Sequence, residues 1–165
     1  MTNFISNLYY RCRHGIKIYR NVLKEEERLN LLRYSKKYLK VVSESHPGLQ
    51  TYADLHLKID YDNYLTLNKL VKKMKIKVTD IVLCWLNYGD SGVGHIFWHT
   101  HPYKQTSIYY IENPEGLGTL FRHKGKEFRI DVPTNSLMII PGKIEHTAPY
   151  EILTKPRYSF VIDNN

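Results

Sequence analysis

Hydrophobic residues recur with two different spacings along the chain, and the change from one to the other falls near residue 79. Segment 15–23 alternates apolar and polar residues, which predicts a half-buried strand. Segment 24–40 follows with acidic residues first and lysines last, the charge polarity that the helix dipole favours, and predicts a helix. A second amphipathic helix is predicted where apolar residues stand at helical spacing, at Leu67, Leu70, Val71 and Met74.

From residue 79 onward the chain consists of short β-rich runs separated by glycines and prolines. Such runs at this spacing are typical of a sandwich or barrel. With the helices before them, they predict an α+β, mainly β fold in which the helices buttress one sheet of a jelly roll. We expect a single domain over 1–165, with a strand and supporting helices in 1–78 and the jelly-roll core in 79–165. The predicted strands are 79–88, 94–101, 105–112, 117–121, 127–131, 136–141, 146–153 and 156–163.

Composition narrows the class of protein further. The 165 residues are 42% apolar and 24% charged, close to the average for globular proteins, and no apolar run approaches the length of a membrane helix. The chain start lacks the apolar segment of a secretory signal, so we expect a cytoplasmic, reducing location, with no membrane partner. Cys12 and Cys84 form no CxxC pair, which excludes a disulfide framework and a four-thiolate zinc site.

The net charge of +8 is unevenly placed. Residues 1–40 hold ten Lys and Arg against three acids, whereas 41–165 hold fourteen against thirteen. A basic face of this kind favours nucleic acid or another acidic partner, and it is equally typical of a solvated surface. Nucleic-acid binding through the basic N-terminal region therefore stays open.

Three histidines form the first candidate chemical site. His99 and His101 stand two apart in a predicted strand, so their side chains should project from the same face. His146 follows the turn at Pro141-Gly142, where a barrel can bring it opposite the other two. Three imidazole donors on one side of a metal leave the remaining positions open to substrate and oxidant. The alternative is three separate histidines that bind no metal.

A second candidate lies in the last predicted strand. Arg157 and Ser159 should share a face, and a guanidinium group binds a carboxylate through two parallel hydrogen bonds. The partner is either an internal Asp or Glu or the carboxylate of a bound dicarboxylate. Together with the three histidines, this spacing favours a metal site beside a dicarboxylate site.

The order His99-Thr100-His101, then His146, then Arg157-x-Ser159 resembles the Fe(II)/2-oxoglutarate-dependent dioxygenase superfamily and its pattern on a double-stranded β-helix. The prolyl hydroxylase-like branch is the most similar, because segments 86–90 and 107–111 match its Tyr-Gly loop and its apolar-Tyr-Tyr-apolar run. The chain also resembles small bacterial and phage oxygenases of this type. The resemblance implies Fe(II), 2-oxoglutarate and O₂ as cofactor and cosubstrates.

Carried onto single residues, the resemblance implies that His99 and His146 bind iron and that Arg157 with Tyr110 holds the distal carboxylate of 2-oxoglutarate, supported by Ser159. It places Tyr88 beside the metal. The family has Asp where this chain has His101. Either His101 is the third ligand, or water takes the carboxylate position; Asp90 and Glu145 are the acids nearest in sequence.

The function expected from the resemblance is hydroxylation of a C–H bond, with a protein or peptide side chain, foremost prolyl, as the substrate. Two alternatives remain. One is a cupin-like metalloprotein that uses three histidines, with Gln105 as a further ligand, and no 2-oxoglutarate. The other is a jelly-roll binding module without activity. The sequence indicates neither the oligomeric state nor the identity of the substrate.

Overall fold

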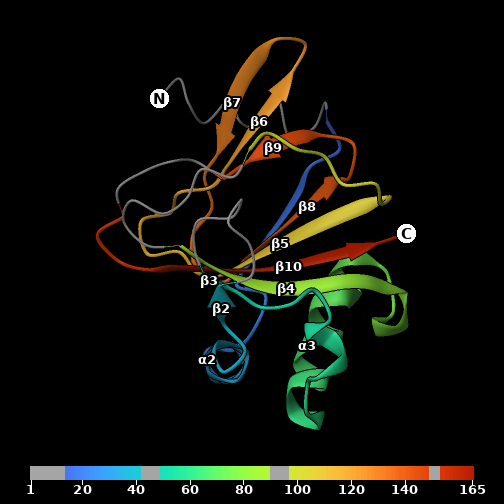
Figure 1. Cartoon of the computed structure of the whole chain (residues 1–165), viewed down its shortest axis with the longest axis vertical. Coiled ribbons are helices and arrows are strands. Elements are labelled where there is room, and N and C mark those ends of the chain that lie inside the picture. The colour runs from blue at the N-terminus through green and yellow to red at the C-terminus, as the bar shows by residue number, and fades with distance from the viewer. Residues whose placement is uncertain (1–13, 42–48, 90–96, 149–152) are drawn as a thin grey trace.

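The computed structural model describes residues 14–41, 49–89, 97–148 and 153–165, which form two antiparallel sheets with two helices on the outer side of the larger one (Figure 1). The larger sheet has the strand order β1-β8-β5-β10-β4-β3-β2 and the smaller one the order β7-β6-β9. The strands are β1 (Lys17–Arg20), β2 (Lys40–Val41), β3 (Leu49–Gln50), β4 (Ile81–Gly89), β5 (Gln105–Glu112), β6 (Thr119–His123), β7 (Lys126–Ile130), β8 (Ser136–Pro141), β9 (Glu145–Thr147) and β10 (Arg157–Asn164).

The helices begin where local hydrogen bonds satisfy their first backbone N–H groups. Helix α2 (Glu25–Lys36) starts after Lys24, whose backbone N–H donates to the Glu27 carboxylate at 3.0 Å. Helix α3 (Tyr61–Met74) starts after Asp60, whose side chain accepts from the backbone N–H of Asn63 at 3.0 Å. Two short 3₁₀ helices, η1 (Leu55–Leu57) and η2 (Val78–Asp80), flank α3.

Strand alternation separates two hydrophobic cores on the two faces of the larger sheet. The outer core joins both helices to every second residue of the central strands, among them Leu86, Tyr109, Phe160 and Ile162. The inner core lies between the two sheets and contains Ile16, Ile108, Tyr110, Phe121, Ile130, Val132, Met138 and Ile140. The arrangement confirms the predicted mainly β jelly roll with buttressing helices.

Most of the predicted strands are present, and the predicted strands that differ are those that contain the histidines. Residues 97–101 form no strand; His99 makes only an isolated antiparallel bridge with His146. Of the predicted strand 146–153, the structure has Glu145–Thr147 as β9, and residues 149–152 lie outside the described part of the chain. The prediction also missed the short strands β2 and β3, whose two residues each carry no periodic pattern.

Within the described ranges, no helix has both the length and the apolar character needed to cross a bilayer.

Candidate metal centre and cosubstrate cavity

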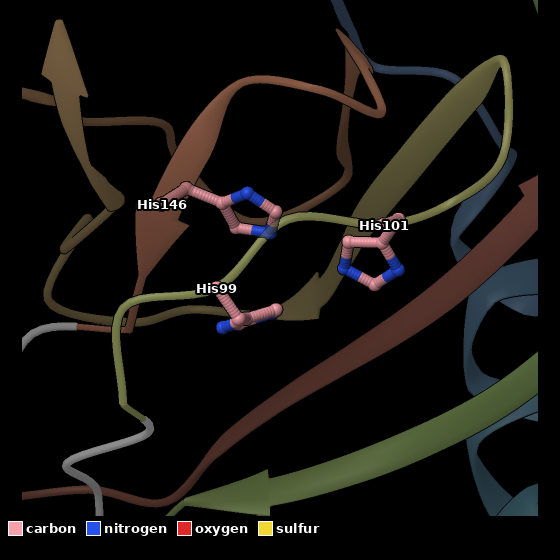
Figure 2. A group of neighbouring side chains, drawn as sticks. All are labelled: His99, His101 and His146. Carbon is pink, nitrogen blue, oxygen red and sulfur yellow. The ribbon is translucent and has the colours of Figure 1, made fainter.

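His99, His101 and His146 meet in one cluster although only the first two are neighbours in sequence (Figure 2). The nitrogen atoms that they offer lie within 4.8 Å of one another. Their ring centroids are 4.5 Å apart for His99 and His146, 5.1 Å for His99 and His101, and 5.2 Å for His101 and His146. Small side-chain rotations bring nitrogens at this separation to one ion, since metal–imidazole bonds are about 2.0–2.1 Å long.

Backbone pairing, rather than a regular strand, holds the cluster together. His99 and His146 exchange both backbone hydrogen bonds, at 3.1 and 3.0 Å. The backbone N–H of His101 donates to the carbonyl of Gly142 at 2.8 Å. Gly142 is needed there because a Cβ atom would lie 2.0 Å from the carbonyl oxygen of Tyr103. The turn predicted at Pro141-Gly142 therefore docks the His99–His101 segment against the start of β9.

The hydrogen bonds of the three rings select one tautomer. Nδ1 of His99 lies 2.8 Å from the carbonyl oxygen of Phe97, and Nδ1 of His146 lies 2.9 Å from that of Ile144. A carbonyl oxygen only accepts, so Nδ1 must carry the proton in both rings. Nδ1 of His101 contacts a carboxylate oxygen of Asp163 at 2.8 Å. In each neutral ring the lone pair is then on Nε2, the nitrogen that a metal would bind.

His146 is the most buried of the three, with 4% of its surface exposed. Its pKa is lowered to about 3, mainly by burial and to a smaller extent by the neighbouring His99 and His101. The ring is therefore neutral at physiological pH, which is the state that a metal ligand requires.

The cluster opens into a cavity of about 150 Å³ between the sheets. The residues that line it from the larger sheet follow strand alternation strictly, because their neighbours in each strand face the helices. These lining residues are Trp85 and Asn87 of β4, Thr106, Ile108 and Tyr110 of β5, and Arg157, Ser159 and Val161 of β10. Gln50, Thr119 and Ala148 complete the wall with the three histidines.

The structure thus brings Arg157 and Ser159 into the same cavity as the three histidines. The guanidinium group lies near Tyr110, whose pKa is raised by burial and lowered in part by the hydrogen bond with Thr119 and by the positive charge of Arg157. The hydroxyls of Tyr110 and Thr119 are 2.5 Å apart. Four polar groups of the cavity, from three strands, therefore gather at the end that Arg157 occupies.

Tyr88 does not take the position that the family resemblance implied. It packs against the outer core, and its ring centroid lies 5.2 Å from that of Tyr158. Alternation in β4 turns Tyr88 to the helices and Asn87 to the cavity. Of the acids nearest the histidines in sequence, Glu145 lies 3.6 Å from Arg122, and Asp90 is outside the described residues.

Two groups that contact the cluster were not predicted. Asp163 bonds His101, and the ring of Trp85 stacks against the same histidine with centroids 6.2 Å apart and planes at 19°. The sequence contained a signal for Asp163, because it lies four residues after Ser159 and therefore shares the face of Arg157 and Ser159.

No protein-family model matches the sequence, and no curated protein matches it significantly. Solved structures do resemble the chain. HygX from Streptomyces hygroscopicus, crystallised with nickel and 2-oxoglutarate, superposes with a TM-score of 0.71 at 10% identity, over 95% of this chain and 85% of that one. A prolyl-4-hydroxylase of Pseudomonas putida gives 0.64 at 13% identity, over 97% and 98%.

A third similar structure is a prolyl hydroxylase of Trichoplax adhaerens in complex with a peptide fragment of hypoxia inducible factor. It has a TM-score of 0.67 at 15% identity, over 95% of this chain and 86% of that one. At such identities the likeness establishes the fold. The chain has the jelly-roll fold of these structures, which is the fold that the sequence predicted.

Proposed function

We propose that the protein is an Fe(II)- and 2-oxoglutarate-dependent oxygenase that hydroxylates a substrate C–H bond. The observation that carries the proposal is the single cavity that contains three convergent imidazoles and the guanidinium group of Arg157. The fold, shared with a protein crystallised with nickel and 2-oxoglutarate, supports it.

The donor set fits a divalent iron ion. His99, His101 and His146 would hold it through Nε2, because each Nδ1 is directed at an oxygen acceptor. Imidazole is a suitable ligand for iron, and three ligands leave positions open for the cosubstrates. Iron together with 2-oxoglutarate would supply the oxidising chemistry, in which O₂ oxidises the substrate C–H bond and converts 2-oxoglutarate to succinate and CO₂.

The other polar residues of the cavity would orient the cosubstrate. Arg157 would bind the distal carboxylate of 2-oxoglutarate bidentately, with Tyr110 and Ser159 beside it. The cosubstrate would then extend toward the histidines, which share the cavity. These residues would fix the position of 2-oxoglutarate and balance its charge. Their main contribution would be to reduce the translational and rotational freedom of the bound reactants.

The substrate class that we propose is a protein or peptide side chain, with prolyl residues first. Similarity to prolyl hydroxylases, one of them solved with a bound peptide, supports this choice. Phe97 supports it as well, since its ring is 70% exposed two residues before His99 and offers an apolar contact at that edge. HygX, crystallised with hygromycin B, shows that the same fold also accepts small molecules.

Nucleic acid is the second substrate class. Lys37, Lys40 and Lys58 line a surface pocket with Tyr52, whose ring lies 3.3 Å from the Lys40 ammonium group. Cationic and aromatic groups in this mixture bind single-stranded nucleic acid in other proteins.

The cupin-like alternative is favoured by one observation, the histidine at position 101 in place of the family's Asp. Its fourth ligand is not favoured, because the amide of Gln105 donates to the side chain of Asn164 at 3.1 Å. A binding module without turnover is the third candidate.

The test is to add 2-oxoglutarate to the anaerobic Fe(II) protein and record the weak visible charge-transfer band. We expect a band in the wild type and none in Arg157→Ala, whereas Arg33→Ala, on an exposed face of α2, should retain it. A protein that binds iron without giving a band would be the cupin-like alternative.

A band without succinate formation on any peptide or oligonucleotide would indicate the binding module. Succinate formation with a peptide pool but not with an oligonucleotide pool would support the proposed substrate class, and the reverse result would overturn it.

A further inference from the structure

A buried carboxylate lies directly behind the histidine that departs from the family pattern. Oδ2 of Asp163 is 2.8 Å from Nδ1 of His101, and the two side chains are 1% and 11% exposed. Asp163 does not line the cavity, and among the described residues that line it there is no carboxylate. The histidine therefore stands between the acid and the position of the metal.

The carboxylate is held by a second contact. The hydroxyl of Thr106 donates to Oδ1 of Asp163 at 2.6 Å, so both oxygens of the buried group have a polar partner. A buried carboxylate needs such partners, and hydrogen bonds to the charged form stabilise it. Thr106 comes from β5, which pairs with β10 at this very position.

Three contacts orient His101 and its ring. Trp85 stacks on its face, and its backbone N–H is bound to the Gly142 carbonyl. The contact with Asp163 places the ring proton on Nδ1 and the lone pair on Nε2, on the side of His99 and His146. The Nδ1 atoms of His99 and His146 contact the backbone carbonyls of Phe97 and Ile144 instead.

Charge gives this contact its significance. Three neutral imidazoles leave a divalent ion with its full double charge, whereas two imidazoles and one carboxylate reduce it by one unit. Asp163 supplies that unit through the ring of His101, because a carboxylate that accepts from Nδ1 makes the ring a stronger donor to a metal.

We propose that Asp163 is a positioning residue of the metal centre, which acts through His101 and supplies the negative charge that the described residues lining the cavity do not provide. The inference rests on the proposed function in so far as it assumes that the three histidines bind a metal. The inference also gives His101 a role. The hydrogen-bonded pair of His101 and Asp163 would act on the metal as one negatively charged ligand does.

The decisive experiment is a double-mutant cycle on metal affinity. Binding of Ni(II) and Co(II) to the otherwise metal-free protein is measured by titration calorimetry for the wild type, Asp163→Asn, His101→Ala and the double variant. We expect Asp163→Asn to weaken binding about 10- to 100-fold in the wild-type background. In the His101→Ala background the same substitution should change the affinity less than about threefold, because its effect is transmitted by the imidazole.

Thr106→Val is the matched control. It removes the other hydrogen bond of the same buried carboxylate and leaves the charge in place. We expect it to lower the stability of the metal-free protein in urea but to weaken metal binding much less than Asp163→Asn does. The visible spectrum of the Co(II) protein should shift more in Asp163→Asn than in Thr106→Val, because Asp163 is the group that contacts His101.

A measurement on the wild type covers the case in which Asp163→Asn does not fold. Long-range ¹H–¹⁵N spectra of the Zn(II)-loaded protein should show His101 protonated on Nδ1 and bound to metal through Nε2. The opposite tautomer would overturn the inference.

The outcomes separate this inference from the proposed function. If Asp163→Asn binds both metals as tightly as the wild type, or loses equal affinity with and without His101, only the role of Asp163 is wrong. If the wild type binds neither metal, the proposed function fails together with it.

Discussion

The hydroxyl groups of Tyr110 and Thr119 lie 2.5 Å apart across the two sheets, inside the cavity that Arg157 enters. Tyr110 is 2% exposed, and burial raises the pKa of its hydroxyl, so the group is protonated at physiological pH. Two hydroxyls joined by one hydrogen bond retain a second proton, which is available to an anion beside the guanidinium group.

Tyr110→Phe should therefore weaken binding of 2-oxoglutarate to the anaerobic Fe(II) protein about tenfold, since a hydrogen bond to a charged group contributes about 1.5 kcal/mol or more. Calorimetric titration measures the change. Tyr109→Phe is the control, because the neighbouring Tyr109 faces the helices and its hydroxyl donates to Asn135 at 2.8 Å. Equal losses in the two variants would contradict a role for Tyr110 in the cavity.

Acid should destabilise the metal-free protein through His146. Its pKa is lowered to about 3 in the folded protein, mainly by burial, and returns to about 6.5 on unfolding. Between these values the unfolded chain binds a proton that the folded chain does not, so the free energy of unfolding falls as the pH falls. The expected loss from this group is about 2 kcal/mol between about pH 7.5 and pH 5.

Urea unfolding in the presence of a chelator tests this pH dependence. His146→Gln should lose less stability over the same interval, by the amount attributed to the histidine. Parallel pH profiles for the two proteins would show that the ring is not held neutral by the fold.

Asn135, the residue before β8, joins this strand to the start of α2, and its replacement should lower the stability of the fold. Its backbone has a positive φ of 62°, its side chain accepts from the backbone N–H of Leu23 at 3.1 Å, and it donates to the carbonyl of Leu23 at 2.8 Å. Asn135→Ala should lower the free energy of unfolding by about 3 kcal/mol, from lost hydrogen bonds and left-handed strain.

Asn135→Gly separates the two causes, because glycine adopts the same φ without strain. We expect it to recover about 1 kcal/mol of the loss and no more. Full recovery in the glycine variant would mean that the hydrogen bonds to Leu23 contribute little.

The thiol of Cys84 should be unreactive while the protein is folded. The residue is fully buried in the outer core, and burial raises the pKa of its thiol well above the usual value. In a Cys12→Ser background, a thiol reagent at about pH 8 should label the unfolded chain within minutes and the folded chain only as fast as it opens. Rapid labelling in native buffer would contradict the packing of β4 against the helices.

Strand alternation accounts for what the sequence predicted well. It placed Arg157 and Ser159 on one face, and both line the cavity. The same rule in β4 favours Asn87 over Tyr88, but the expectation for Tyr88 came from the family resemblance and did not use it. Alternation also places Asp163 on the face of Arg157 and Ser159, but it does not identify the partner of the carboxylate, because His101 lies 62 positions away.

The segment around His99 was less predictable for a physical reason. Its backbone pairs with single residues of the β8–β9 turn and β9, so no periodic pattern is required of its side chains. The same holds for β2 and β3, whose two-residue strands depend on pairing with each other and with β4 rather than on their own composition.

The last strand carries Arg157, Ser159 and Asp163 on alternate residues of a single face, between two antiparallel neighbours. A slip of one residue in its pairing would turn all three toward the helices at once. A chain with this register error would lose the proposed carboxylate anchor, Arg157, and the proposed support of the metal, Asp163, in the same event. If the proposed function is right, a chain in the wrong register would bind neither 2-oxoglutarate nor iron, so correct pairing of one strand is a condition for both.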